Sequence, residues 1–203
     1  GTVGAAPVQN VGAYGQEIVQ VLDSVLAYDL KEEKYVTIKK EDMKLGYRSS
    51  IFNHGEDAGR YLIISMTIHL SHDTLTPPFY TSLQNYVEEH QITDFSPKSI
   101  REMVTEIRWS KLPKPEEMAS SGSFFKNVYL DDAEADRLRG MNVPVWEGNK
   151  VPSGWLIDHA GLKGMVFHGM RVSEKAALIL INESAQSYAH LKQAREEIVS
   201  IIE

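Results

Sequence analysis

Apolar residues recur along the first third of the chain with the spacing expected of β-strands. Segments 17–30 and 34–40 are rich in β-branched and aromatic residues in rough alternation, and a charged turn at 31–33 separates them, which predicts a β-hairpin. Segment 61–70 alternates more regularly and predicts a half-buried strand. Its apolar residues are expected on one face: Leu62, Ile64, Met66, Ile68 and Leu70.

Helical spacing appears further along the chain. Segment 96–108 predicts a helix with Ser96 as its N-cap and Pro97 at its first position. Three more helices are expected, one from Asp131 or Asp132, one over 153–160 and one from Ser184 to the end. The last has an apolar stripe of Tyr188, Leu191, Ala194, Ile198 and Ile201. Short strands are expected at 122–130, 164–170 and 177–182, so the pattern favours an α+β fold.

Composition narrows the classes of function. The net charge of −7 argues against a nucleic-acid-binding protein, since binding to phosphate backbones needs clustered Lys and Arg. The absence of cysteine excludes disulfides, thiolate metal sites and cysteine nucleophiles. No apolar run has the length of about 20 residues that a membrane helix needs. None of the seven histidines lies in a metal-binding pattern, so no metal site is expected.

The first fifteen residues form a glycine-rich loop around Pro7, Gln9 and Asn10. Such a loop lets backbone N–H groups approach a diphosphate or a ring system, although by itself it is more often only a turn. Because no strand precedes the loop to anchor it, we expect the chain to be part of a longer protein.

Two further segments carry candidate chemistry. In Gly46–Phe52 the guanidinium of Arg48 lies among aromatic and apolar neighbours, which suits an anion clamp or a surface cation whose stem covers Tyr47. In Ser121–Asn127 a serine stands between a glycine and two phenylalanines, and Lys126 follows. The G-x-S-x-G pattern of hydrolases is missing, which disfavours a Ser-His-Asp triad.

These segments, taken together and in order, resemble the UDP-N-acetylenolpyruvoylglucosamine reductases. The resemblance spans nearly the whole chain, and the tyrosine-bearing region near Tyr80 is similar to the longer subtype. It rests on five ordered matches, GTVGAAPVQNVGAYG at 1–15, GYRSSIF at 46–52, KLP at 111–113, GSFFKN at 122–127 and SGWLIDHAGLKG at 153–164.

The resemblance implies a cytoplasmic, monomeric oxidoreductase of peptidoglycan precursor synthesis. In that family NADPH reduces bound FAD, and the enolpyruvyl double bond of UDP-N-acetylglucosamine-enolpyruvate is then reduced to give UDP-N-acetylmuramate. The resemblance makes Ser123 the acid that protonates one carbon of the enolpyruvyl double bond. It makes Arg48 a group that stabilises the enolate formed when hydride reaches the other carbon. We expect Lys126 to support Ser123.

The resemblance also implies binding residues and domains. The substrate contacts are expected at Tyr80, Lys111, Gly122 and Asn127, and the FAD contacts at Gly1, Thr2, Gln9, Asn10, Gly12, Ala13 and Tyr14. Residues 1–70 are expected to be the C-terminal part of a PCMH-type FAD-binding domain without its N-terminal lobe. Residues 71–203 are expected to be an α+β substrate-binding domain truncated at its end.

The chain departs from the family in ways that leave a second hypothesis open. The family has a preceding glycine-rich flavin loop and a glutamate motif after the last helix, and this sequence contains neither. The residue pattern therefore also allows an isolated nucleotide-sugar-binding unit without catalysis.

Overall fold

The computed structural model describes residues 2–114 and 116–203 and forms two compact units, Gly1–Val104 and Thr105–Glu203. The division between them falls within helix α2 (Pro97–Lys111). The predicted boundary at 70/71, which separates a FAD-binding from a substrate-binding domain, stays a prediction. No helix among the described residues is long and apolar enough to cross a membrane.

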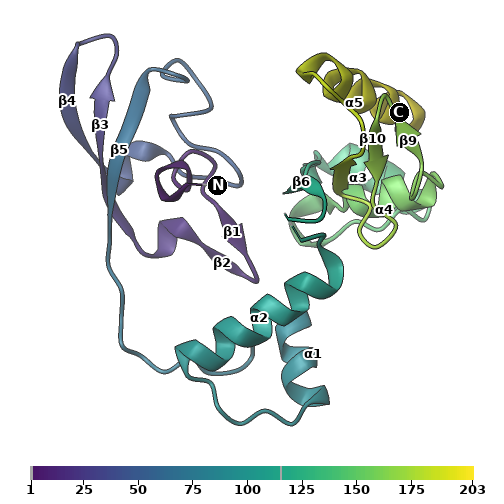
Figure 1. Cartoon of the computed structure of the whole chain (residues 1–203), viewed down its shortest axis with the longest axis horizontal. Coiled ribbons are helices and arrows are strands. Elements are labelled where there is room, and N and C mark those ends of the chain that lie inside the picture. Colours follow the sequence, from purple (N-terminus) through teal and green to yellow (C-terminus); the bar gives the residue numbers. More distant parts are fainter. Residues whose placement is uncertain (1, 115) are drawn as a thin grey trace. The chain divides into compact units, whose positions relative to one another are not determined.

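The first unit is built on a three-stranded antiparallel sheet in the order β4-β3-β5 (Figure 1). Its elements are η1 (Val3–Ala5), β1 (Gly12–Ala13), β2 (Gln16–Glu17), η2 (Ile18–Gln20), β3 (Leu22–Asp29), β4 (Lys34–Lys39), η3 (Lys40–Met43), β5 (Tyr61–Ile68) and α1 (Thr81–Glu89). The predicted hairpin is confirmed, since Asp29 pairs with Lys34 across the charged turn. Its first strand begins at Leu22 because residues 18–20 form η2.

The side chains of β5 do not follow the predicted faces. Leu62 and Ile64 are more than half exposed, whereas Ile63 and Met66 pack against the core of this unit. Leu26 pairs with Ser65 and the next residue of β3, Ala27, pairs with Ile63, so Ile64 is the extra residue of a β-bulge. The bulge reverses the alternation, and the prediction of one apolar face was wrong for this reason.

The second unit packs helices on a four-stranded antiparallel sheet in the order β6-β11-β10-β9. Its elements are the end of α2, β6 (Ala119–Ser123), β7 (Val128–Tyr129), α3 (Asp132–Gly140), η4 (Glu147–Asn149), β8 (Lys150–Val151), α4 (Ser153–His159), β9 (Val166–Phe167), β10 (Met170–Val172), β11 (Ile179–Asn182) and α5 (Tyr188–Ile202). Val172, Leu180 and Ile198 lie in its core.

Most of the predicted helices are confirmed with their caps. The Ser96 hydroxyl accepts a hydrogen bond from the Ser99 amide at the start of α2, and Asp131 caps α3 by accepting from the Glu134 amide at 2.8 Å. Helix α5 begins at Tyr188 and not at Ser184, because Asn182 closes a turn with Ala185 through two hydrogen bonds.

Three other expectations need correction. The stripe of α5 is shorter than predicted, because Tyr188 is 77% exposed and Ile201 is 48% exposed. The strand expected over 122–130 is two strands, β6 and β7, separated by residues 124–127. The strand expected over 164–170 is the hairpin of β9 and β10, whose turn residues His168 and Gly169 both have positive φ angles.

Candidate functional site

In the first unit, the opening loop and the Arg48 turn are held together by polar contacts. The Arg48 guanidinium donates from Nη2 to the Gly12 carbonyl at 2.6 Å, and Nη1 lies 3.9 Å from a carboxylate oxygen of Glu17. The guanidinium carbon also lies 5.3 Å from the ring centre of Tyr47. The guanidinium itself, and not the stem, lies over Tyr47 and faces the loop, and both interpretations of Arg48 stay predictions.

Asn10 is the most deeply buried polar residue of the opening loop, with 1% exposure. Its Nδ2 donates to Glu17 at 2.9 Å and to the Gly46 carbonyl at 3.1 Å, and its Oδ1 accepts from the Val19 amide. These bonds commit the side chain to the shape of the loop. Its predicted part in FAD binding is therefore limited to supporting neighbouring residues, and it stays a prediction.

Gly12 is required by packing within the loop. A Cβ at this position would lie 2.7 Å from the Gln16 carbonyl oxygen and 2.7 Å from Cγ of Glu17. The glycine lets strands β1 and β2 approach, with Gly12 paired to Glu17.

The exposed face of the loop agrees in kind with a flavin site. Thr2, Gln9 and Ala13 are exposed, and they offer a hydroxyl, an amide and a small side chain. The Tyr14 ring is half-buried and meets the ring of Tyr80 edge to face, with centroids 6.0 Å apart. Gly1, the remaining predicted FAD contact, lies outside the described residues.

In the second unit, Ser123 is the exposed last residue of β6. Gly122 before it has a φ angle of 77°, a conformation that side-chain-bearing residues rarely adopt. After it, the Phe124 amide donates to the Leu178 carbonyl at 2.7 Å. The serine hydroxyl therefore lies at a bend fixed by the backbone on both sides.

Asn127 has a structural task of its own. Its side-chain oxygen accepts from the Ser153 amide at 3.1 Å, and the Ser153 hydroxyl donates to the Lys126 carbonyl at 2.6 Å. These bonds fix the end of the GSFFKN segment to the start of α4. A substrate contact by Asn127 would therefore use Nδ2, and this contact stays a prediction.

Lys111, at the end of α2, lines a cavity of about 510 Å³. Four basic side chains and two acidic ones line this cavity, Lys111, Lys114, Arg171, Lys175, Glu117 and Glu174. Trp109 contributes an exposed aromatic face. We call this the cationic cavity, and its size and excess of positive charge suit a phosphorylated ligand.

Sequence reasoning missed Arg171 and Lys175, which stand about sixty residues beyond Lys111. The antiparallel pairing of β10 with β11 places Arg171 opposite Ile181, and both residues line the cavity. The available signal was alternation, because Arg171 lies between the buried Met170 and Val172.

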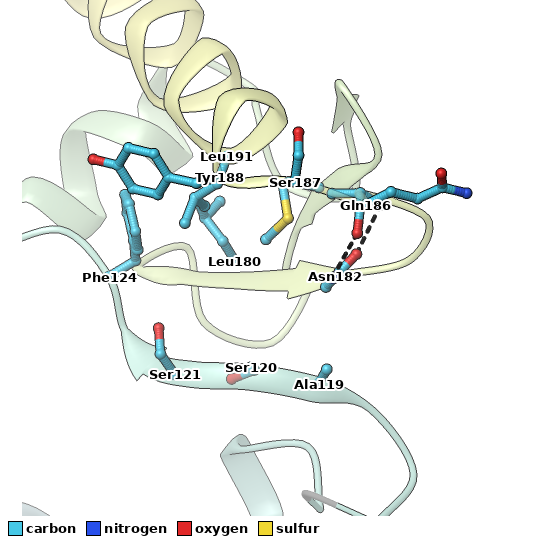
Figure 2. A pocket seen from close by; sticks show the side chains of 12 residues that line it. Ala119, Ser120, Ser121, Phe124, Leu180, Asn182, Gln186, Ser187, Tyr188 and Leu191 are labelled. Atoms are coloured by element: carbon cyan, nitrogen blue, oxygen red, sulfur yellow. Dashed lines mark hydrogen bonds between the residues drawn. The ribbon is translucent and has the colours of Figure 1, made fainter. Parts of the chain in front are cut away.

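A second cavity of about 520 Å³ lies between β6, β11 and the start of α5 and is lined by uncharged side chains (Figure 2). Phe124 and Tyr188 stand at one end, and Asn182 and Gln186 stand at the other. It contains no predicted site residue. The described residues also hold no cluster of three or more potential metal ligands.

Comparisons with known proteins find relatives along nearly the whole chain. Residues 114–203 match the family model of the UDP-N-acetylenolpyruvoylglucosamine reductase C-terminal domain. The reductase of Idiomarina loihiensis is 37% identical over 98% of this chain and 60% of its own length, and that of Neisseria gonorrhoeae is 38% identical over 98% and 59%.

A solved structure supports the fold. The crystal structure of UDP-N-acetylenolpyruvylglucosamine reductase from Thermus caldophilus matches 98% of this chain and 56% of its own chain, with a TM-score of 0.60 and 18% identity. The chain spans about 60% of the length of the curated relatives that it matches. Nearly the whole chain is therefore similar in sequence to UDP-N-acetylenolpyruvoylglucosamine reductases, and residues 114–203 match the model of their C-terminal domain.

Proposed function

We propose that the protein containing this chain is a reductase that converts UDP-N-acetylglucosamine-enolpyruvate to UDP-N-acetylmuramate. The observation that carries the proposal is the cationic cavity, because it adds Lys114, Arg171 and Lys175 to the Lys111 that family resemblance selects. FAD reduced by NADPH supplies the hydride in this reaction. The residues of the chain bind the substrate, stabilise its developing charge and move a proton.

The nucleotide end of the substrate is assigned to the second unit. A diphosphate carries at least two negative charges, and charge-assisted hydrogen bonds from Lys and Arg are the strong ones available to a protein. Lys114 pairs with Glu117 at 3.6 Å, and Arg171 pairs with Glu183 just outside the lining. Three carboxylates therefore stand against four cations, which leaves a smaller excess of positive charge. Asn127, Tyr80 and the Gly122 backbone remain proposed further contacts.

The reacting end is assigned to Arg48 and Ser123. As charge develops on the carboxylate of the enolpyruvyl group, a permanently charged, planar guanidinium is well suited to stabilise it. The exposed Ser123 hydroxyl is proposed to protonate the carbon of the enolpyruvyl double bond that does not receive the hydride. A serine is a weak acid, so we assign Lys126 to stabilise the alkoxide that forms.

The Lys126 assignment has its own test. Replacing Lys126 with methionine keeps an unbranched side chain of nearly the same length and removes its charge. We expect flavin reoxidation by the enolpyruvyl substrate to slow by at least about tenfold in the complete, FAD-loaded enzyme. An unchanged reoxidation rate would contradict the supporting role of Lys126.

A second candidate function has a specific observation in its favour. All residues of the cationic cavity come from positions 109–181, within the second unit. A nucleotide-sugar-binding unit without catalysis could therefore use this cavity alone.

The two candidates separate in one pair of titrations. The 203-residue chain is titrated with FAD, followed by flavin fluorescence, and with UDP-N-acetylglucosamine-enolpyruvate, followed by calorimetry. Saturable binding of both ligands supports the reductase, whereas binding of the nucleotide sugar alone supports the second candidate. Binding of neither ligand contradicts both.

Matched variants connect the titrations to the cavity. We expect Lys111→Ala to weaken binding of the nucleotide sugar about tenfold, as the loss of one charge-assisted hydrogen bond predicts. Lys192→Ala removes the same charge from an exposed position on α5 and should leave the affinity unchanged. Equal effects of the two substitutions would show that net charge, and not the cavity, governs binding.

A further inference from the structure

Glu17 lies where three parts of the first unit meet. It is the second residue of β2, it pairs with Gly12 of β1, and its side chain is 36% exposed. Its two carboxylate oxygens face different partners. One accepts a hydrogen bond from Asn10 Nδ2 at 2.9 Å, and the other lies 3.9 Å from Arg48 Nη1. One carboxylate thus contacts both the opening loop and the turn that presents Arg48.

The loop side of this junction is rigid. Asn10 has a φ angle of 43° and is almost fully buried, so its position is fixed by its partners and not by solvent. Glu17 takes one Nδ2 hydrogen bond and Gly46 takes the other, which ties Asn10 to the first residue of the Arg48 turn as well.

The turn side is equally constrained. Gly46 and Ser49 exchange two backbone hydrogen bonds around Tyr47 and Arg48, and Arg48 has a φ angle of 52°. Such a left-handed conformation is uncommon for a residue with a long side chain, and it is strained. The surrounding contacts must hold this conformation in place. The Gly12 carbonyl at 2.6 Å and the Glu17 carboxylate are two polar partners of its guanidinium.

We propose that Glu17 is a positioning residue, which orients the Arg48 guanidinium against the opening loop so that the loop and the cation act as one preformed part of the site. The proposal rests on the proposed function, in which Arg48 stabilises the enolate. Glu17 itself touches no reacting atom.

The energetics favour orientation over stability as the role of this contact. Both side chains are partly exposed, at 27% for Arg48 and 36% for Glu17, and such ion pairs contribute little to folding. A fixed guanidinium direction matters far more to a reaction, because a displacement of about 1 Å can slow catalysis about a hundredfold. The contact therefore reduces the number of directions in which a long, flexible side chain points.

The first arm of the test needs neither cofactor nor activity. In the 203-residue chain, the Arg48 Nε–H signal is followed by NMR and assigned by its loss in Arg48→Lys. We expect a dispersed signal in the native chain and in the control Glu41→Gln, which removes an exposed carboxylate of η3. Glu17→Gln and Glu17→Ala should shift the signal toward the position of a free arginine, although the contacts with Gly12 and Tyr47 remain. A signal that stays in place in both Glu17 variants overturns the proposal.

The second arm is a double-mutant cycle in the FAD-loaded enzyme that contains this chain. Glu17→Ala should slow flavin reoxidation by the enolpyruvyl substrate about tenfold or more, but by less than about twofold when Arg48 is already alanine. A purely structural role for Glu17 predicts the same factor in both backgrounds, and that result overturns the proposal.

The two failures can be told apart. If Arg48→Ala leaves the reoxidation rate unchanged, the proposed function of Arg48 is wrong. If Arg48→Ala slows reoxidation strongly and Glu17→Ala does not, the function of Arg48 stands and the positioning role is wrong.

Discussion

The opening loop with its Arg48 turn and the cationic cavity use polar residues in opposite ways. In the loop, Asn10 and Arg48 are bonded to their own chain through Glu17, Gly12 and Gly46. Lys111 and Lys175, by contrast, line a cavity of about 510 Å³. Polar groups that satisfy one another fix a shape, whereas charges gathered around a space favour a ligand. Substitutions should therefore cost stability in the loop and affinity in the cavity.

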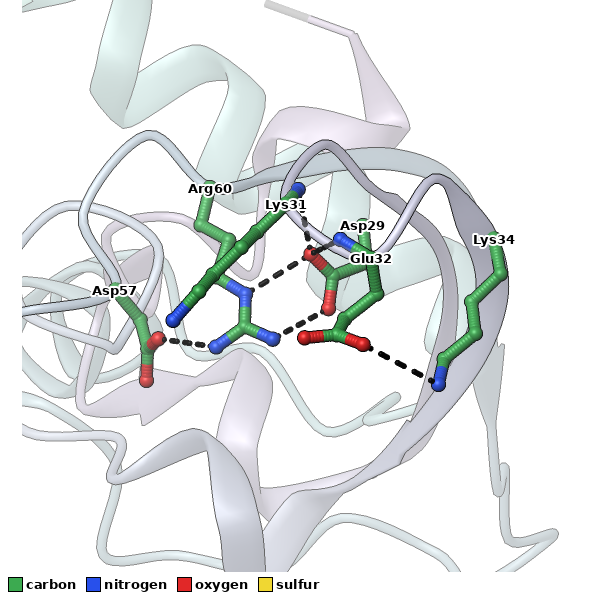
Figure 3. Close-up of polar contacts among 6 residues, drawn as sticks. All are labelled: Asp29, Lys31, Glu32, Lys34, Asp57 and Arg60. Atoms are coloured by element: carbon green, nitrogen blue, oxygen red, sulfur yellow. Dashed lines mark hydrogen bonds and ion pairs between the residues drawn. The ribbon is translucent and has the colours of Figure 1, made fainter.

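The largest loss of stability is expected outside both regions, at the ion pair of Asp29 and Arg60 (Figure 3). Asp29 is 2% exposed and accepts two hydrogen bonds from Arg60, at 2.9 and 2.6 Å, and two more from the Lys31 and Glu32 amides. Arg60→Ala leaves this carboxylate buried without its cation. We expect a larger fall in Tm than for any substitution below, measured by calorimetry.

The same pair gives a pH dependence. The Arg60 hydrogen bonds, assisted by the two amides, hold the pKa of Asp29 well below its usual range. The folded state therefore binds this proton less readily than the unfolded chain, so stability is present above about pH 4, the unfolded value, and is lost as the pH falls through the folded pKa. Asp29→Asn should flatten this acid limb in denaturant titrations from pH 6 to 2. An unchanged slope would assign the acid sensitivity to other groups.

Within the loop, Asn10→Ala tests whether mutual hydrogen bonding fixes the shape. The change leaves the Val19 amide and the Gly46 carbonyl without their side-chain partner and opens a small void. We expect a loss of about 3 kcal/mol in the free energy of unfolding, measured with urea. A loss below about 0.5 kcal/mol would remove the contrast with the cavity.

Gly12→Ala and Gly46→Ala form a matched pair in the same region. The added methyl group collides with Gln16 and Glu17 at position 12, while at position 46 nothing lies within 4 Å. We expect Gly12→Ala to destabilise the protein by about 2 kcal/mol and Gly46→Ala to stay within about 0.5 kcal/mol of the native value. Equal urea midpoints for the two variants would contradict the close packing of β1 on β2.

Arg171→Ala tests the cavity side of the comparison. The side chain is paired with Glu183, the residue after β11, and its loss should change the free energy of unfolding by less than about 1 kcal/mol. The affinity of the Arg171→Ala chain for the nucleotide sugar should fall about tenfold. A variant that loses stability and keeps its affinity would place Arg171 with the structural residues.

Local signals in the sequence predicted much of the fold. The Ser96 cap, the helix start at Asp131 or Asp132 and the charged turn at 31–33 depend on signals within a few residues. The structure has all three where they were expected. Helix α1 was missed because its N-cap residue, Tyr80, makes no side-chain capping bond, and because only Leu83 and Val87 mark its buried face.

The site was predictable only as far as its motifs are contiguous. Resemblance selected Arg48 and Lys111. The structure places Lys111 at the cationic cavity, whereas the Arg48 guanidinium contacts the Gly12 carbonyl and the Glu17 carboxylate. Glu17 and Arg171 carry no motif, and their significance depends on pairings of β2 with β1 and of β10 with β11. Strand register decides such neighbours, and a single extra residue changes it.

Ile64, the bulge residue of β5, shows how one extra residue changes which side chains of a strand face the core. Without it, the strand would read Tyr61, Leu62, Ile63, Ser65, Met66, Thr67, Ile68, in which the four residues that now face the core fall on every second position. Ile64 corresponds to a one-residue insertion in an otherwise regular strand, and the bulge accommodates it. A shortened chain lacking Ile64 could keep the same apolar face and would present one large apolar side chain fewer to solvent.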